Sequence, residues 1–259
     1  MNILDTIIDN TRLEVSTAKS VSPLSMLKDM PGYDRTCLSL VQSLQTDDVA
    51  VIAEIKKASP SKEIIRENFH PVDIAQEYIQ CGARALSVLT DRKYFHGDIR
   101  SIAEIRPLSP LPLLRKDFVI DSYQLSEAKA FGADAVLLIA AALAPRQLKE
   151  LHAEANELGL ECLVEVHHER ELEALDSSQV RLLGVNNRDL TDFSVDVSTT
   201  VRVAAQVPKG ITIVSESGIA SRKDIDTLIA HGIHAVLVGE SLLRQPSPGQ
   251  ALQALIGRQ

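Results

Sequence analysis

Two charged residues interrupt an apolar run near residue 50, in the segment VIAEIKKASPSK over residues 51–62. Residues two apart in a strand share a face, so Glu54 and Lys56 point to one side and Ile55 to the other. Charged groups are costly to desolvate in a strand that is covered on both sides. Their face should therefore open onto a polar cavity or a ligand, although a self-satisfied buried ion pair would explain this one pair equally well.

The same design recurs where other apolar runs end. Charged or amide side chains stand in RKD over residues 115–117, in VEV over 164–166, in NNR over 186–188 and in SES over 215–217. A single such residue is explained by helix capping or by a neighbouring lysine. Five strands that each offer such a group toward one edge predict a shared site for acid and base chemistry.

Two short turns predict a phosphate site. The segments SGI over residues 217–219 and GES over 239–241 each lead from an apolar run into a helical pattern. Backbone N–H groups at such turns bind phosphate, and Lys56, Ser59 and Arg188 can add charge-assisted contacts. The glutamate of the second turn fits only if its side chain turns away. The alternative, that the glycines only permit tight turns, remains open.

Metal and nucleophile chemistry find little support. The adjacent His167 and His168 point in different directions, without a further histidine at ligand spacing, so we interpret them as capping or solvated loop residues and expect no metal. His96 is interpreted as a loop residue. Cys162 falls within a strand and is expected to be structural, and no G-x-S-x-G segment occurs.

The elements that position these groups alternate between short apolar runs and longer amphipathic ones. The predicted strands are 50–56, 85–90, 112–116, 135–140, 161–166, 182–187, 212–216 and 235–239. The predicted helices include 4–19, 72–80, 122–130, 145–157, 222–230 and 249–256, the first with Leu4, Ile7, Ile8 and Leu13 on its apolar face. Eight such units predict an α/β fold, a single (β/α)8 TIM barrel with an extra N-terminal helix. A doubly wound open sheet is the alternative, but no G-x-G-x-x-G segment occurs.

Composition limits the function classes. The 259 residues carry a net charge of −8, a hydrophobic fraction of 45% and three widely spaced cysteines. We expect one domain over 1–259, with 1–48 as a helical extension, in a reducing cytoplasm without a targeting segment or membrane span. The acidic balance argues against nucleic acid as a partner. A monomer is the expected state, since the amphipathic helices suffice to cover one barrel.

At this point a family resemblance is visible. The segment AEIKKASPSK over residues 53–62 resembles the signature of indole-3-glycerol phosphate synthase. Further segments resemble that family in order, and they are LRKDFVID (114–121), GADAVLLI (132–139), LVEV (163–166), GVNNRDL (184–190), SESGI (215–219) and VGES (238–241). One departure is Glu63, where the family has glycine; we expect it to alter the conformation and mobility of the first βα loop and to lower turnover.

The resemblance implies a carboxy-lyase of tryptophan biosynthesis that needs no cofactor. It closes the ring of 1-(2-carboxyphenylamino)-1-deoxyribulose 5-phosphate to indole-3-glycerol phosphate, with loss of carbon dioxide and water. Lys116 is the implied general acid, Lys56 contacts the substrate carboxylate or phosphate and can donate a proton during dehydration, and Glu165 and Glu54 are alternative bases. By the family pattern Asn186 and Glu216 orient the substrate and Phe118 flanks its aromatic ring. The expected phosphate and substrate contacts are Ser59, Arg188, Ser217, Gly218, Gly239 and Glu240.

Two other functions remain conceivable. A strand-end lysine such as Lys116 can form a Schiff base with a keto-sugar phosphate, as in an aldolase. A barrel could also sense a sugar phosphate without converting it, which would leave the charged residues without a purpose.

Overall fold

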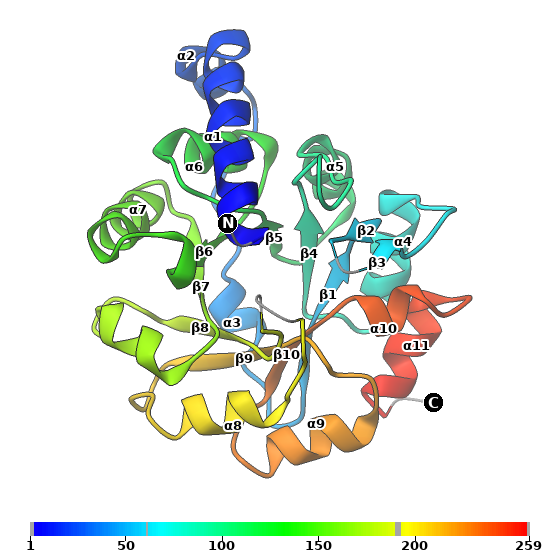
Figure 1. The fold of residues 1–259 in the computed structure, drawn as a ribbon. Coiled ribbons are helices and arrows are strands. Elements are labelled where there is room, and N and C mark those ends of the chain that lie inside the picture. The colour runs from blue at the N-terminus through cyan, green and yellow to red at the C-terminus, as the bar shows by residue number, and fades with distance from the viewer. Residues whose placement is uncertain (1–2, 61, 190–192, 258–259) are drawn as a thin grey trace.

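The computed structural model describes residues 3–60, 62–189 and 193–257, without the side chains of Lys62 and Glu63. Eight parallel strands form a closed barrel in the order β1-β10-β9-β8-β7-β6-β5-β4, and helices surround it (Figure 1). The predicted TIM barrel is thereby confirmed, and the open sheet is excluded.

The strands of the barrel agree with the predicted ones to within about one residue at either end. They are β1 (Ala50–Ile55), β4 (Ala85–Leu89), β5 (Leu113–Lys116), β6 (Ala135–Ile139), β7 (Glu161–Val166), β8 (Leu182–Asn186), β9 (Thr212–Glu216) and β10 (Ala235–Val238). The helices outside the barrel are α4 (Pro71–Gln80), α5 (Arg100–Ile105), α6 (Ser122–Phe131), α7 (Pro145–Glu157), α8 (Ser198–Ala204), α9 (Arg222–Ile229), α10 (Glu240–Leu243) and α11 (Pro248–Leu255). The connections also contain the 3-10 helices η1 (Arg106–Leu108), η2 (Ala140–Ala142) and η3 (Glu169–Ala174).

Strand alternation sorts the side chains into two layers. In β7, Val164 and Val166 belong to the layer between barrel and helices, whereas Leu163 lies in the separate cluster inside the barrel. Glu165 has the parity of Leu163 and therefore faces inward above it. On β1, β5, β7, β8 and β9 the inward row ends in a charged or amide side chain, which places these groups at one mouth. The inward row of β6, formed by Ala135, Leu137 and Ile139, is apolar throughout.

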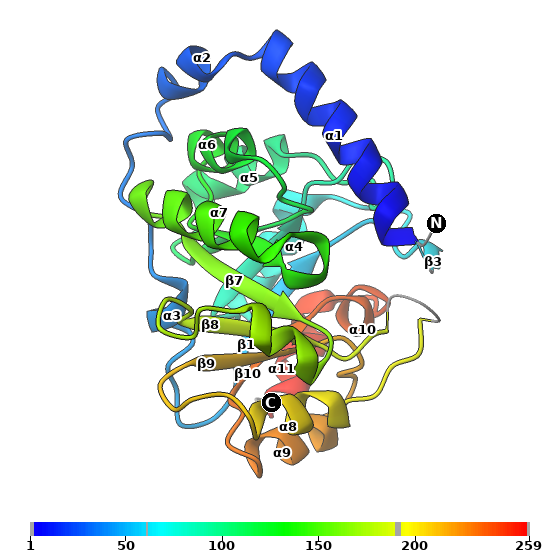
Figure 2. The same cartoon turned by 60° about the vertical axis from the view of Figure 1, so that its left-hand side comes forward.

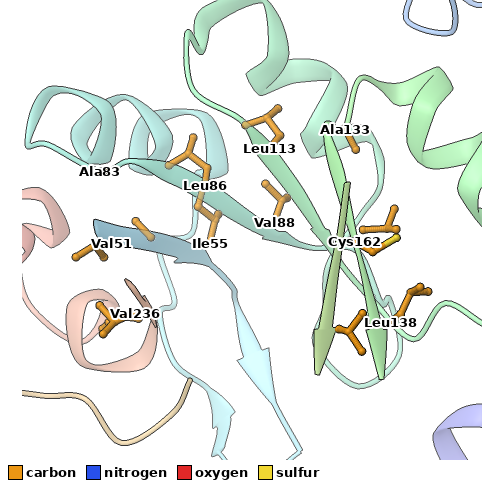
Figure 3. Close-up of a cluster of buried hydrophobic side chains, with 14 of the residues drawn as sticks. Val51, Ile55, Ala83, Leu86, Val88, Leu113, Ala133, Leu138, Cys162 and Val236 are labelled. Atoms are coloured by element: carbon orange, nitrogen blue, oxygen red, sulfur yellow. The ribbon is translucent and has the colours of Figure 1, made fainter. Parts of the chain in front are cut away.

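The layer between the barrel and the helices contains a larger cluster of buried hydrophobic side chains than the inside of the barrel does, and Figure 3 shows part of it. Val51 and Ile55 of β1 lie in it with Leu86 and Val88 of β4, as the period of two predicts for the residues that flank Glu54. Cys162 is also buried there, and burial raises the pKa of its thiol to about 12. Its position agrees with the predicted structural role, because an un-ionised buried thiol is a poor nucleophile.

Three helices precede β1, namely α1 (Ile3–Val21), α2 (Leu24–Lys28) and α3 (Leu40–Ser43). Leu40 and Val41 of α3 join the cluster inside the barrel and close its amino-terminal end. The helices α1 and α2 lie beside α6 (Figures 1 and 2).

Leu13 of α1 is 70% exposed, contrary to prediction, because six residues turn it about 240° from the buried Ile7. The division of the chain into a barrel and an extension over residues 1–48 stays a prediction.

The first βα loop carries a two-stranded ribbon that the sequence patterns did not predict. Strands β2 (Ala58–Ser59) and β3 (Lys62–Ile64) pair antiparallel. The predicted effect of Glu63 on this loop stays a prediction, since its side chain lies outside the described residues. Within the described part of the chain, no helix has the length and apolar character needed to cross a membrane.

Candidate active site

A cavity of about 460 Å³ opens at the carboxyl ends of the barrel strands. All of the predicted catalytic and binding residues line it. They are Glu54, Lys56, Ser59, Lys116, Phe118, Glu165, Asn186, Arg188, Glu216, Ser217, Gly218, Gly239 and Glu240. The convergence that the strand ends predicted is therefore present in the fold, and the roles of these residues remain proposals.

Lys116 lies at the centre of the charged group. Its Nζ is 3.1 Å from Glu165 Oε2 and 3.3 Å from Glu216 Oε2, so β5, β7 and β9 each contribute one member. Both carboxylates are buried. One buried cation between two carboxylates makes protonation of the three side chains interdependent.

The environment separates the pKa values of the two carboxyl groups. Burial favours the neutral form of Glu165, but the charges of Lys116 and His167 outweigh burial and hold its pKa below the usual value. Burial raises the pKa of Glu216; Lys116 opposes the rise and Glu165 reinforces it, so the pKa stays well above the usual value. Lys116 is also desolvated, yet Glu165 and Glu216 raise its pKa above that of an ordinary lysine. The site thus holds an ammonium beside a strongly ionised Glu165, an arrangement suited to paired acid and base chemistry.

Glu54 and Lys56 form a second ion pair at the end of β1, with Lys56 Nζ 2.6 Å from Glu54 Oε1. The pair lines the cavity wall and so does not merely satisfy itself inside the core. Gly239 makes room for it, because a Cβ at that position would lie 2.5 Å from Glu54 Oε1.

Gly184 has the corresponding function for Glu216. It lies in β8 opposite Glu165, and a Cβ added there would stand 2.2 Å from Glu216 Oε1. Glu216 Cδ and Leu163 Cδ1 would both be at 3.3 Å. Any side chain at residue 184 must therefore displace the Glu216 carboxylate from its place near Lys116.

We expect Gly184→Ala to lower kcat about 100-fold, since a misplacement on the order of 1 Å can cost that much, and to destabilise the fold by about 1–3 kcal/mol through overpacking. Steady-state kinetics and urea unfolding measure the two effects. The Glu216→Ala background provides the control: there Gly184→Ala should cost little further stability, because the displaced carboxylate is gone. An equal cost in both backgrounds would contradict this explanation.

Amide and hydroxyl groups link the ends of β8 and β9. Ser217 Oγ donates to Asn186 Oδ1 at 2.9 Å, while Asn187 Nδ2 donates to the carbonyl oxygen of Ser217 and to Ser215 Oγ. Ser217 and Gly218 have φ values of 66° and 80°, and such strain in a serine is typical of ligand sites. The two hydrogen bonds donated by Asn187 fix this turn.

Two arginines also line the cavity, Arg188 after the end of β8 and Arg244 after α10. Arg188 donates from Nη1 to the carbonyl oxygen of Phe193 at 3.2 Å and lies with its Nη2 3.9 Å from Glu240 Oε2. The Glu240 carboxylate also accepts from Arg244 Nε at 3.0 Å. It therefore faces two arginines at the rim, and Arg244 is a lining residue that the sequence patterns missed.

An apolar part of the cavity lies around two aromatic rings. Phe118 and Phe95 have their ring centroids 6.1 Å apart. Leu4 and Ile7 of α1 also line the cavity, so the extra helix contributes directly to the site. Sequence patterns did not predict Phe95 as a lining residue, because its loop, residues 94–97, gives no periodic signal. They did not place Leu4 and Ile7 in the cavity, because the sequence does not show where α1 docks.

His167 corrects one prediction. It is not a solvated loop residue: its side chain is 4% exposed, with Nε2 3.4 Å from Glu165 Oε1. His168 is exposed, as expected. Strand β7 ends at Val166, and the backbone N–H of the next residue, His167, donates to Glu171 of η3, which holds His167 in its buried position. Within the described residues, no three His, Cys, Asp or Glu side chains are grouped to hold a metal ion.

Comparisons with known proteins identify the family of the chain. A family model described as indole-3-glycerol phosphate synthase matches residues 4–255. Proteins of that name are similar to the chain over nearly its whole length. The one from Salinibacter ruber is 52% identical over 98% of this chain and 95% of its own, and the one from Chromobacterium violaceum 46% identical over 98% and 97%.

Among solved structures, a mutant tryptophan synthase alpha-subunit from Pyrococcus furiosus superposes with a TM-score of 0.60 at 16% identity, covering 81% of this chain and 98% of its own. At that identity the likeness concerns the barrel alone. The family model and the full-length relatives, together with a charged cavity at the strand ends, show that the chain belongs to the indole-3-glycerol phosphate synthase family.

Proposed function

We propose that this cavity closes the ring of 1-(2-carboxyphenylamino)-1-deoxyribulose 5-phosphate, with Lys116 as general acid and Glu165 as base. The observation that carries the assignment is the position of Lys116 Nζ, 3.1 Å from Glu165 and 3.3 Å from Glu216. The ammonium is kept protonated and aimed into the cavity, as a proton donor to a carbonyl requires.

The reaction needs protons at three points. As the aromatic carbon that bears the carboxylate attacks the keto carbon, Lys116 donates a proton to the carbonyl oxygen. The bond to the carboxylate then breaks, carbon dioxide leaves and aromaticity returns. In the last step the hydroxyl group takes a proton from Lys56 and leaves as water, and Glu165 removes a proton from the adjacent methylene carbon of the new five-membered ring. Glu165 then lies within hydrogen-bonding distance of Lys116 and can return a proton to it.

The Glu54–Lys56 pair is assigned to the substrate carboxylate and to the departing hydroxyl. Lys56 is 17% exposed at its side chain, so it can contact a bound anion while Glu54 holds it in place. Glu54 remains the alternative base, because its carboxylate lines the same cavity. We place the aromatic ring of the substrate between the apolar wall and Phe118.

A Schiff-base mechanism fits the site less well. An amine must be unprotonated to attack a carbonyl, but Glu165 and Glu216 raise the pKa of the Lys116 ammonium despite its burial. Mere binding would leave a buried acid and base pair facing the cavity without use. Neither alternative is favoured by an observation at this site.

The direct test is turnover of the carboxyphenylamino substrate. Purified protein should produce indole fluorescence together with one equivalent of carbon dioxide. An analogue with an alcohol in place of the ketone should bind without reacting, because it offers no carbon for attack. Stabilisation by substrate without product would support the binding-only alternative and overturn the proposal.

Phosphate is assigned to Arg188, Ser59 and the backbone of the turns at Gly218 and Gly239. We expect Arg188→Ala to raise KM about 10- to 100-fold with a smaller change in kcat, because a hydrogen bond to a charged group contributes about 1.5–3 kcal/mol. Initial rates at varied substrate concentration measure this. Arg146→Ala, on the outer face of α7 with its side chain 90% exposed, is the control and should leave both constants unchanged. A fall in kcat at constant KM would remove Arg188 from phosphate binding.

A further inference from the structure

His167 occupies a buried position that the proposed chemistry has not used. Its ring lies between two carboxylates, with Nε2 3.4 Å from Glu165 Oε1 and Nδ1 3.7 Å from Glu171 Oε2. These contacts do not have the geometry of hydrogen bonds, so neither ring nitrogen has a hydrogen-bond partner among the described residues. Buried polar atoms are normally paired, so an imidazole left between two acids indicates an electrostatic function.

The fold holds the ring there through η3. The backbone N–H of His167 donates to Glu171 Oε2 at 2.8 Å, which fastens η3 to the end of β7. The Glu171 side chain is 21% exposed and thus connects the buried ring with the solvent edge. The carboxylate of Glu165 is shared: Oε1 faces His167 and Oε2 faces Lys116.

The charges around the ring favour the imidazolium form. The groups that act on His167 are the carboxylates of Glu165 on β7, Glu171 in η3 and Glu216 on β9, with Lys116 as the cation beyond Glu165. Burial lowers the pKa of His167, but the carboxylates outweigh burial and raise it above that of a free histidine. A cation also fits the two distances, since an imidazolium can direct one N–H toward each acid.

We propose that His167 is a positioning residue, an imidazolium that joins Glu171 to Glu165 and keeps the Glu165 carboxylate ionised with Oε2 turned toward Lys116 and the substrate. The role of His167 rests on the proposed role of Glu165 as the base. His167 does not touch the substrate in this assignment. It acts through the orientation and the charge of its neighbour, as the residues behind a catalytic group commonly do.

The test is the pH dependence of kcat in His167→Gln. Glutamine keeps an N–H donor but removes the charge, so kcat near neutral pH should fall about 10-fold while KM stays within about twofold. The acid limb of the kcat profile should move up by about one pH unit, because Glu165 loses a cation that lowers its pKa. Glu171→Gln should also move the acid limb of the kcat profile to higher pH, but by less than His167→Gln does.

Two controls make the outcome specific. His168→Gln changes the exposed neighbour and should leave the profile unchanged. In a Glu165→Gln background the His167 substitution should cost little further activity, since its target carboxylate is absent. An unshifted acid limb in His167→Gln overturns the inference. If instead Glu165→Gln alone keeps normal kcat, the base assignment fails and not the contact between the two residues.

A measurement on the intact enzyme covers the case in which the variants do not fold. Nitrogen NMR of ring-labelled histidine should show one imidazolium that persists above about pH 6.5, the ordinary histidine pKa. A His167 that is neutral at pH 6 would exclude the proposed bridge.

Discussion

Replacing Lys116 by alanine is expected to lower kcat at least about 10²- to 10⁴-fold, the usual contribution of general acid catalysis. Lys116 is the cation among the three central side chains, and it lines the cavity with its pKa raised above that of an ordinary lysine, so it is protonated at neutral pH. Alanine leaves the keto oxygen without a donor, whereas substrate binding through the phosphate contacts is retained. Single-turnover measurements with fluorescence of the indole product report the chemical step.

The same variant should show a changed dependence on pH. Without Lys116, burial of Glu165 and Glu216 is no longer opposed by that cation, so the pKa of both rises. Ionised, uncompensated carboxylates destabilise the folded state above these pKa values, and protonation relieves the cost below them. The loss in unfolding free energy is therefore larger at pH 8 than at pH 5, and the fold is best verified at pH 5.

Lys149→Ala is the matched control for this experiment. That lysine lies on α7 with its side chain 69% exposed, paired with Asp176 and away from the cavity. It should leave kcat unchanged. Near-normal kcat in Lys116→Ala would remove Lys116 from the acid role, and a borohydride-trapped adduct at Lys116 in the unmodified enzyme would favour Schiff-base chemistry instead.

The strand ends could be predicted because the barrel imposes a period of two. Once Val164 and Val166 face the helices, Glu165 must face inward, and the same rule places Glu54 beside Lys56. Parallel strands bring all of these ends to one mouth. Local patterns therefore contained both the fold and the charged centre of the site.

The remaining parts depend on contacts between distant segments. Leu4 and Ile7 reach the cavity only because α1 docks across the barrel, and Phe95 only because its loop is held by Asp91, whose carboxylate accepts from the N–H groups of Tyr94 and Phe95. The burial of His167 depends on η3, which no helical period predicts.

The roles of glycines are the hardest part of such a site to predict from the sequence. In the sequence Gly184 looks like an ordinary strand residue and Gly239 like part of a phosphate-binding turn, yet each leaves the space that a neighbouring carboxylate fills. Their function follows from the absence of a side chain, and an absent side chain gives no pattern. The distances in the fold are needed to see it.

Replacing Glu165 by glutamine should lower kcat about 10²- to 10⁴-fold, and replacing Glu216 in the same way should lower it less than about 10-fold. The two carboxylates flank the same ammonium, but their pKa values are shifted in opposite directions. In the proposed assignment Glu165 acts as an ionised base, which glutamine cannot replace. Glu216 takes up a proton far more readily, and glutamine imitates its neutral, hydrogen-bonding form.

Parallel kinetics of Glu165→Gln and Glu216→Gln measure this difference, with circular dichroism to verify the fold. The pH profile provides a second check with a defined sign. A base whose pKa is lowered remains ionised as the pH falls, so the acid limb of the unmodified enzyme should lie below the ordinary glutamate pKa of about 4.3 where binding and folding persist. Equal losses in the two variants would mean that the carboxylates act as a coupled pair. A larger loss at Glu216 would reverse their roles, because the base would then be the carboxylate above Gly184.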